Sequence, residues 1–343
     1  MLSKIKSALR ALPMGSSVAQ ILLAAGVVTA VMIVLIMNRK DVLNGARSLA
    51  TVNTAWLILA TVATLAIWLV GTITQFGSMP GRPSVRKVFA VQIAASFANH
   101  ISPAGSGGIA INVRFLQKVG LSRGAAVGSV GLNSLVGLVT HLIWLVAVVI
   151  VSPAVLVSVR DQVHFGDWKA SIASVPLTTW LIGIAVIAAV VTLAVLVTRH
   201  NAWARKQAGR IRRMPRKLAR EMKTLGAVIR HPKRAAALWL GSFSVPLLHS
   251  LILYAVLQGV GAPVDVGMVV VIYVIVSSLS TVVPGLGGVS ALDVVLPWAF
   301  VTLAGVDSLD AVAAVFGYRM LTVWVPLVPG AWMFAFLIRR RII

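Results

Sequence analysis

Cysteine is absent from this sequence of 343 residues, and acids are scarce, with eight Asp or Glu against 31 Lys or Arg. Without cysteine the chain can form neither disulfides nor cysteine-ligated zinc sites. Six scattered histidines and so few carboxylates leave little for another metal site, so we expect neither metal nor cofactor. No nucleophile–base–acid set and no nucleotide-binding loop stands out, so we do not expect an enzyme.

Charged residues of both signs are also few, at 11%, whereas 59% of residues are hydrophobic and the mean hydropathy is +0.95. These values are far from those of an average soluble domain and indicate an integral membrane protein. The formal net charge of +23 could suggest a nucleic-acid partner. However, the basic residues cluster in short loops between apolar runs, where they mark cytoplasmic sides instead, so we expect no nucleic-acid partner.

Apolar runs of about 20 residues, the length that crosses a bilayer, predict six full spans. They lie at about 18–37, 54–76, 125–151, 177–198, 235–257 and 311–338. The first run follows Lys4, Lys6 and Arg10, is longer than the core of a signal peptide and lacks a convincing cleavage site. We therefore predict that it is a retained span.

Two further apolar stretches are interrupted by proline and glycine clusters, namely Pro103, Gly105, Gly107 and Gly108, and Pro284, Gly285, Gly287 and Gly288. Proline removes a backbone donor, while glycine allows positive φ and close backbone approach. In hydrocarbon the freed backbone groups must be satisfied by protein or by water in a cavity. We therefore predict two broken re-entrant hairpins, which turn at 103–108 and 284–288 beside a cavity.

The order of these elements is the same in both halves of the chain: span, span, hairpin, span. Three crossings per half place the second half in the opposite orientation, which predicts two inverted repeats, at about 14–151 and 176–338. The predicted fold is therefore an all-α polytopic membrane protein, with residues 1–343 forming one transmembrane domain. One hairpin enters from each face of the membrane.

Loop charge predicts the orientation of the chain. Residues 199–234 carry thirteen Lys or Arg and one acid, Glu221, so this basic loop is predicted to be cytoplasmic. Residues 152–175 have balanced charges, and Asp307 and Asp310 lie in the other predicted outer loop. We expect a multi-pass protein of the cytoplasmic (cell) membrane with both termini in the cytoplasm.

Two opposite charges stand out within the apolar runs of the second half. Arg319 lies eight residues into the last predicted span, about 12 Å along a helix, and an isolated cation at that depth costs at least a few kcal/mol. Asp293, shortly after the second glycine cluster, is the acid that can pair with it. The pair has two compatible interpretations: a structural ion pair, or a pair that handles a solute or protons.

Polar residues also surround the first break: Asn99, His100, Asn112 and Arg114. Helix N-termini after glycine-rich turns favour anions, and arginine can add a bidentate phosphate contact. These four residues, with Asp293, Tyr318 and Arg319, are therefore the predicted binding residues for an anionic headgroup. The lone histidines His141 and His249 are predicted to be polar packing residues.

Four motifs resemble the lysylphosphatidylglycerol synthase transmembrane-region family of flippase-like membrane proteins. They are Asn99 with PAGSGG at 103–108 leading to Arg114, LSRGAA at 121–126, PGLGGV at 284–289, and GYRMLTVWVP at 317–326. The resemblance implies movement of a lipid headgroup across the membrane. Many relatives have a glutamate where Ser290 stands, and Asp293 is a displaced replacement; many also have an acid within the stretch that is 109–113 here. The soluble synthase domain is absent, so aminoacyl transfer is not expected.

The leading functional hypothesis is a lipid translocator, which moves an anionic or polyprenyl-phosphate headgroup through the cavity while the tails stay in lipid. A second hypothesis is an accessory subunit that docks a lipid-modifying glycosyltransferase or synthase through the basic loop. A membrane-embedded transferase is the third. Leaflet distribution of labelled lipid separates the first two, because an accessory subunit alone leaves it unchanged.

The predicted topology can be tested with single cysteines, because the chain has none of its own. A cysteine at position 165 should react with an impermeant maleimide from outside the cell, and one at position 215 only after the membrane is opened. Labelling of both positions from the same side would contradict the topology.

Overall fold

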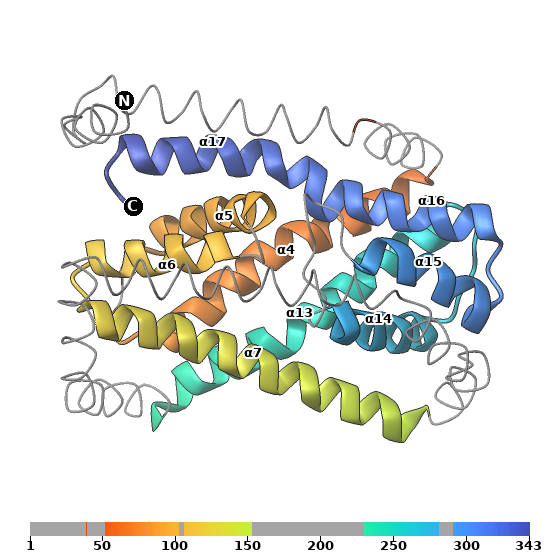
Figure 1. The fold of residues 1–343 in the computed structure, drawn as a ribbon, viewed down its shortest axis with the longest axis horizontal. Helices are drawn as coiled ribbons and strands as arrows, with labels where there is room; N and C mark the ends of the chain where they lie inside the picture. Colours follow the sequence, from red (N-terminus) through yellow and green to blue (C-terminus); the bar gives the residue numbers. More distant parts are fainter. Residues whose placement is uncertain (1–38, 40–51, 82, 103–105, 153–229, 281–290) are drawn as a thin grey trace, which may run out of the picture. The chain divides into compact units, whose positions relative to one another are not determined.

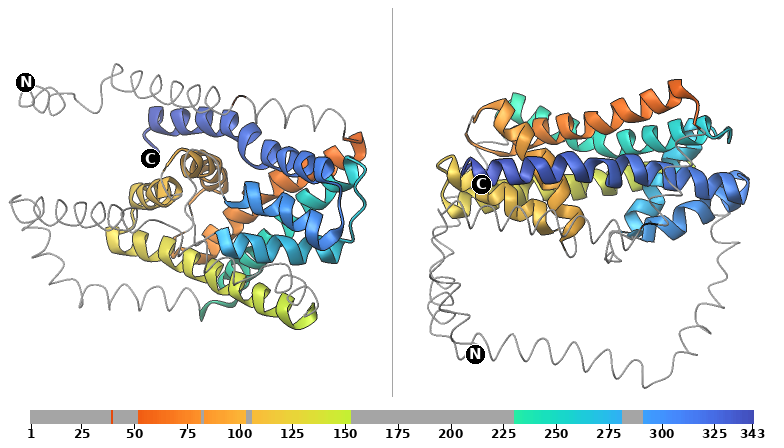
Figure 2. Two further views of the ribbon diagram at one scale, coloured as in Figure 1. Left: turned by 45° about the vertical axis from the view of Figure 1, so that its right-hand side comes forward. Right: turned by 90° about the horizontal axis from the view of Figure 1, so that it is seen from above.

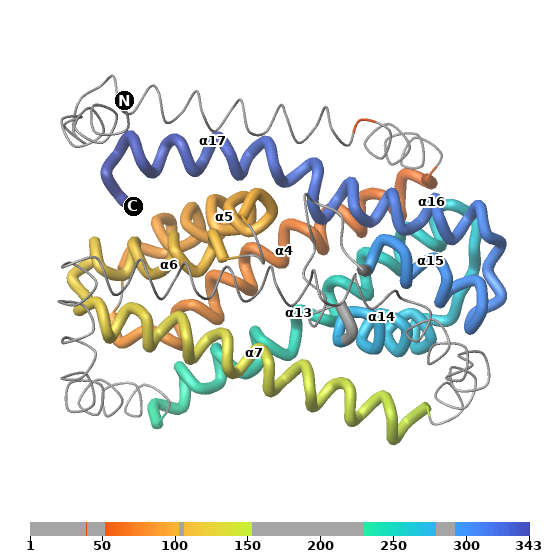
Figure 3. The backbone as a smooth tube through the Cα atoms, viewed as in Figure 1, coloured from red at the N-terminus to blue at the C-terminus, as the bar shows by residue number. Residues whose placement is uncertain are grey.

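The computed structural model describes residues 39, 52–81, 83–102, 106–152, 230–280 and 291–343, and these ranges contain helices but no strand. Predicted spans 18–37 and 177–198, most of the basic loop and the turn at 284–288 lie outside the described residues. Figures 1 and 3 show the described helices, which are α4 (Thr54–Ser78), α5 (Val85–Ile101), α6 (Ser106–Lys118), α7 (Arg123–Val151), α13 (Pro232–Gly259), α14 (Val266–Ser280), α15 (Ala291–Ala304), α16 (Ser308–Arg319), the π-helix η2 (Met320–Trp324) and α17 (Val325–Arg339).

These helices belong to one compact unit, made of residues 1–151 and 225–343. The other unit, residues 152–224, lies almost wholly outside the described residues.

Four of the predicted spans are present as helices that are long and apolar enough to cross a membrane. They are α4, α7, α13 and the continuous run Ser308–Arg339, which contains α16, η2 and α17. Along α7, Leu135, Leu138, Leu142 and Val146 expose more than half of their surface at helical spacing. Such a continuous apolar face suits hydrocarbon rather than water. The described part of the chain is thus that of a helical membrane protein.

Asp or Asn side chains cap the N-termini of three of the described helices. Asn53 accepts a hydrogen bond from the Ala55 amide at 3.0 Å, and Asp307 accepts one from the Leu309 amide at 2.8 Å. Asp265, just before α14, accepts from the Gly267 amide at 2.8 Å. These side chains satisfy donors that the first turn of a helix leaves free, and a carboxylate also favours the positive end of the helix dipole.

The α4–α13 pair depends on glycine for its close approach. A methyl group on Gly77 would lie 2.5 Å from the Leu238 amide nitrogen and 2.8 Å from the Arg234 carbonyl oxygen. Arg234 also donates from its two terminal nitrogens to the Met79 and Pro80 carbonyl oxygens, at 2.9 and 3.0 Å. The arginine therefore satisfies carbonyl groups at the end of α4, where a helix lacks its own donors.

The first predicted break is confirmed, because α5 ends at Ile101 and α6 begins at Ser106. The assignment of Gly107 and Gly108 to the turn is wrong: both lie in the first turn of α6, and neither has a positive φ. Gly107 packs on Ala98 and Ser102, and Gly108 on Asn99, too closely for a side chain. These glycines permit close packing of α6 on α5 rather than a special backbone angle.

The two helix pairs lie at opposite ends of the described bundle. Figures 1 and 2 show α5 and α6 at the end that holds the C-terminus, and α14 and α15 at the other end. Around the first pair, one hydrophobic cluster includes Met79, Phe115, Ala126 and Leu337. Around the second pair, another includes buried residues of α4, α13, α14, α15 and α16, such as Leu257, Ile272 and Phe300. Each end of the bundle therefore has its own core.

The glycine contact of α4 with α13 can be tested by adding one methyl group. Gly77→Ala should lower the free energy of unfolding by about 1–3 kcal/mol, because the methyl group overlaps the backbone of α13. Gly131→Ala in α7 is the matched control, since nothing lies within 4 Å of the added carbon, and it should be neutral or stabilising by about 0.5–1 kcal/mol. Thermal denaturation in detergent measures both. Equal effects of the two changes would contradict close packing at Gly77.

Candidate functional site

A partly buried ion pair joins α15 to the last helical run, Ser308–Arg339. The Nε atom of Arg319, the last residue of α16, lies 2.7 Å from Oδ1 of Asp293 in the first turn of α15. The two side chains expose only 13% and 18% of their surface, respectively. The predicted pairing of these residues is therefore confirmed. Because removing two charges from water is costly, such a pair needs close geometry, and a single charge left in its place is strongly destabilising.

Three rings lie beside this pair, from three different helices. Nδ1 of His249 in α13 lies 2.8 Å from the hydroxyl oxygen of Tyr318, the residue before Arg319, and a hydrogen bond joins them. The His249 ring stacks on Tyr273 of α14, with ring centroids 5.6 Å apart and planes 9° apart. Tyr273 also makes an edge contact with Tyr318, at 6.3 Å between centroids. The three rings therefore fix the positions of α13, α14 and α16 relative to one another.

The backbone changes its hydrogen-bond pattern immediately after Arg319. Residues Met320–Trp324 form the π-helix η2, and the Thr322 hydroxyl donates to the Tyr318 carbonyl oxygen at 2.8 Å. π-Helical turns within α-helices occur frequently at functional sites. Val323 and Trp324 pack against Phe97 of α5. The segment that carries Arg319 thus contacts α5 as well as α15.

Two of the predicted binding residues hold the first hairpin together. Oδ1 of Asn99 accepts a hydrogen bond from the Gly108 amide at 2.8 Å, across the break. Nδ2 of Asn112 donates to the Gly108 carbonyl oxygen at 2.9 Å, and its Oδ1 accepts from Gln92 of α5 at 3.1 Å. Asn99 and Asn112 therefore satisfy polar groups between α5 and α6, and binding of a headgroup by them stays a prediction.

The other two predicted residues of the first hairpin lie in different surroundings. His100 is half-buried and within electrostatic range of both Arg319 and His249. Arg114 is exposed on α6, and among the described residues no hydrogen bond or ion pair joins it to the Asp293–Arg319 pair. The structure therefore brings His100, but not Arg114, to the polar cluster.

The polar cluster is thus made of His100, His249, Tyr273, Asp293, Tyr318 and Arg319. Tyr273 is not among the binding residues predicted from the sequence, and His249 was predicted to be a packing residue. The sequence did contain a signal for both residues, because an ionisable side chain within a long apolar run indicates a functional site by default. A second lone histidine, His141 of α7, lies 3.3 Å from the Ser277 hydroxyl of α14. Within the described ranges, no group of three or more His, Asp or Glu residues could hold a metal ion.

The fold and the cluster define a class: a polytopic helical membrane protein with a charged pair inside its helix bundle. A family model described as the lysylphosphatidylglycerol synthase TM region matches residues 20–330, and the chain belongs to this family. The match includes all six residues of the polar cluster and both glycine-rich breaks. No curated protein matches the chain.

The ion pair predicts an unusual pattern of stability. Asp293→Asn should lower the free energy of unfolding by about 3–5 kcal/mol, because it leaves the Arg319 charge buried without its partner. The double variant Asp293→Asn with Arg319→Gln should regain part of this loss, since no charge then remains. Asp310→Asn, near the exposed start of α16, is the matched control and should change stability by at most about 1 kcal/mol.

These variants can be compared by thermal denaturation in one detergent. Arg319→Gln alone completes the comparison, and a double variant whose loss of stability equals the sum of the losses in Asp293→Asn and Arg319→Gln would show that the two charges do not interact.

Proposed function

We propose that this protein is a lipid translocator, which moves an anionic or phosphate-bearing lipid headgroup across the cell membrane between its two hairpins. The observation that carries the proposal is the partly buried Asp293–Arg319 pair, within a bundle that exposes many large apolar side chains. Arg319 is the twelfth residue of the 32-residue run Ser308–Arg339, so it lies about 16 Å from the outer end of that run. Charges at such depth are rare and mark solute pathways.

The hairpins supply the second part of the proposal. Helices α5 and α6 have 17 and 13 residues, and α14 and α15 have 15 and 14. At 1.5 Å per residue these lengths are about 20–26 Å, below the roughly 30 Å of a bilayer core. Their positions at opposite ends of the bundle support re-entrant hairpins that enter from opposite faces, as in transporters built from inverted repeats.

The charges at the two ends of the bundle support an orientation. The end with α5 and α6 carries basic residues at several helix termini, including Arg86, Lys118, Arg123, Lys233 and Arg339. The opposite end carries Asp265, Asp307 and Asp310. By the positive-inside rule, the basic end, where the C-terminus lies, faces the cytoplasm. The first hairpin then enters from the cytoplasm and the second from outside.

The residues of the polar cluster have distinct roles in this mechanism. Arg319 binds the phosphate of the headgroup, and Asp293 holds the arginine in place when no headgroup is bound. When a headgroup binds, its phosphate replaces the Asp293 carboxylate as the partner of Arg319. The arginine charge is therefore compensated at every stage, which avoids the cost of an isolated buried cation. His100, His249 and Tyr318 provide hydrogen-bonding groups around it, while the acyl or prenyl tails stay in lipid.

The proposal is tested in proteoliposomes that contain fluorescent phosphatidylglycerol. The purified protein should move labelled lipid between leaflets, as measured by the fraction accessible to an impermeant reductant. Arg319→Ala should reduce this movement to the rate of protein-free vesicles, and Arg319→Lys should restore it only in part, because lysine lacks the planar fork of arginine. The neutral double variant Asp293→Asn with Arg319→Gln should be folded but inactive, and Arg123→Gln, outside the cluster, should be fully active.

Normal lipid movement by the neutral double variant would show that the pair is structural. Unchanged leaflet distribution with the unmodified protein would contradict the translocator and favour an accessory subunit for a glycosyltransferase or synthase.

A further inference from the structure

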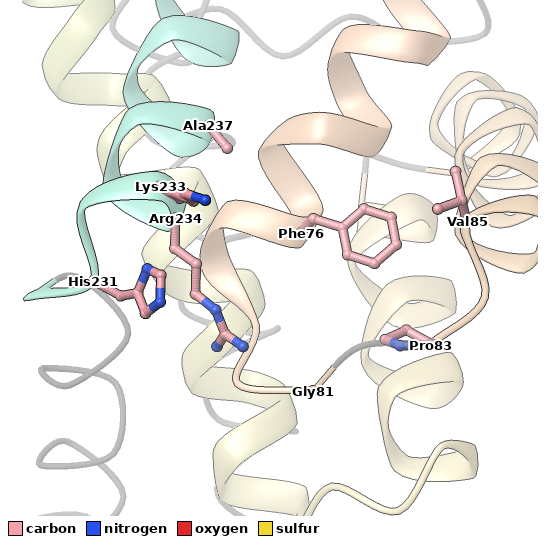
Figure 4. Close-up of a pocket in the computed structure, with 8 residues that line it drawn as sticks. All are labelled: Phe76, Gly81, Pro83, Val85, His231, Lys233, Arg234 and Ala237. Atoms are coloured by element: carbon pink, nitrogen blue, oxygen red, sulfur yellow. The ribbon is translucent and has the colours of Figure 1, made fainter.

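A second site lies at the basic end of the bundle, away from the polar cluster. A cavity of about 320 Å³ opens between the end of α4, the connection to α5 and the start of α13. Figure 4 shows its eight lining residues: Phe76, Gly81, Pro83, Val85, His231, Lys233, Arg234 and Ala237. This volume is at the lower end of the range for small-molecule sites. It suits a headgroup and the first part of one chain rather than a whole lipid.

The lining divides into an apolar side and a basic side. Phe76, Pro83, Val85 and Ala237 provide apolar surface, and Figure 4 shows the Phe76 ring extending from α4 toward Val85. Lys233 and Arg234 extend from α13 toward α4, and His231 lies just before that helix. The described lining residues include no acid. A ligand that fits this lining has a negative charge at one end and hydrocarbon at the other.

The arginine of this cavity is already fixed in position. Its two terminal nitrogens donate to the Met79 and Pro80 carbonyl oxygens, and the side chain is half-buried. Neutral carbonyl groups orient the guanidinium without cancelling its charge, so the cavity keeps a fixed positive field. Lys233, by contrast, is exposed, and among the described residues no ion pair compensates its charge. It can therefore reach toward an anion.

We propose that this cavity is a binding site for a phosphate-bearing lipid, with Lys233 on the phosphate and the chain along Phe76 and Val85. Its position supports this choice of ligand over a soluble phosphate compound. The cavity lies where α4 ends and α13 begins, level with the basic helix termini that mark the headgroup layer. Binding here requires no transport, so the proposal stands apart from lipid translocation.

Site-specific protection of one cysteine tests the proposal, because the chain contains no other cysteine. Ala237→Cys places a thiol in the cavity, and its rate of reaction with a maleimide is measured on the full chain in neutral detergent. Dioctanoyl phosphatidic acid at about ten times its Kd should slow labelling about tenfold, because only the unoccupied fraction reacts. Dioctanoylglycerol, which lacks the phosphate, and inorganic phosphate, which lacks the chains, should give no protection at the same concentration.

Three further variants make the result specific. Lys233→Gln in the Ala237→Cys background should raise the concentration needed for protection about fivefold, because one cation near the phosphate is lost. Val119→Cys, exposed at the same end of the bundle but not lining the cavity, should react equally fast with and without lipid. The neutral double variant Asp293→Asn with Arg319→Gln, in the Ala237→Cys background, should leave protection unchanged, which separates this site from the polar cluster.

Three results would overturn the proposal: labelling of Ala237→Cys unaffected by phosphatidic acid, equal protection of Val119→Cys, or equal protection by inorganic phosphate. The last result would identify a soluble-phosphate site instead of a lipid site.

Discussion

The ion pair between Asp293 and Arg319 is the interaction on which the centre of this protein depends. In a chain with so few acids, one carboxylate compensates the one cation within residues 311–338, and it does so from a different helix. Because a charge left alone in an apolar bundle is costly, α15 and α16 are held in one relative position. The rings of His249, Tyr273 and Tyr318 then connect α13 and α14 to the same point. A few polar contacts thus organise four helices whose surfaces are otherwise apolar.

The helix pairs show how glycine and asparagine replace the hydrophobic effect where lipid surrounds the protein. Apolar burial gives little preference for one helix neighbour over another in hydrocarbon, so close packing and hydrogen bonds decide the arrangement. Gly77 lets α4 and α13 approach until backbone meets backbone, and Gly107 does the same for α5 and α6. Asn99 accepts a hydrogen bond from the Gly108 amide, and Asn112 accepts one from Gln92, across the second of these contacts. Small residues set the distance between helices, and amides fix their register.

The sequence alone predicted the features that depend on composition along the chain. Apolar length identified α4, α7, α13 and the last span, and two charges in apolar runs identified the Asp293–Arg319 pair. The sequence did not predict features that depend on which helices meet. In the sequence, Tyr273 looks like any other tyrosine of a short apolar helix, because its contact with His249 of α13 exists only in the folded structure. The residues around Gly77 give no sign in the sequence that another helix packs against it. Arg234 was counted only as one charge of the basic loop. Gly107 and Gly108 were assigned to a turn because no local signal in the sequence marks the start of a helix at Ser106.

The π-helix η2 has a consequence for the last span as a whole. A π-turn holds one residue more than an α-turn, so the helix beyond it is rotated by about 100° relative to an uninterrupted helix. Before the turn, Tyr318 and Arg319 face His249 and Asp293; beyond it, Gly330 lies against Phe97 of α5. One continuous helix therefore presents differently phased faces to the two hairpins. If the π-turn moved to another position along this helix, the residues between its old and new positions would rotate from one helix pair toward the other. The span itself would stay unbroken.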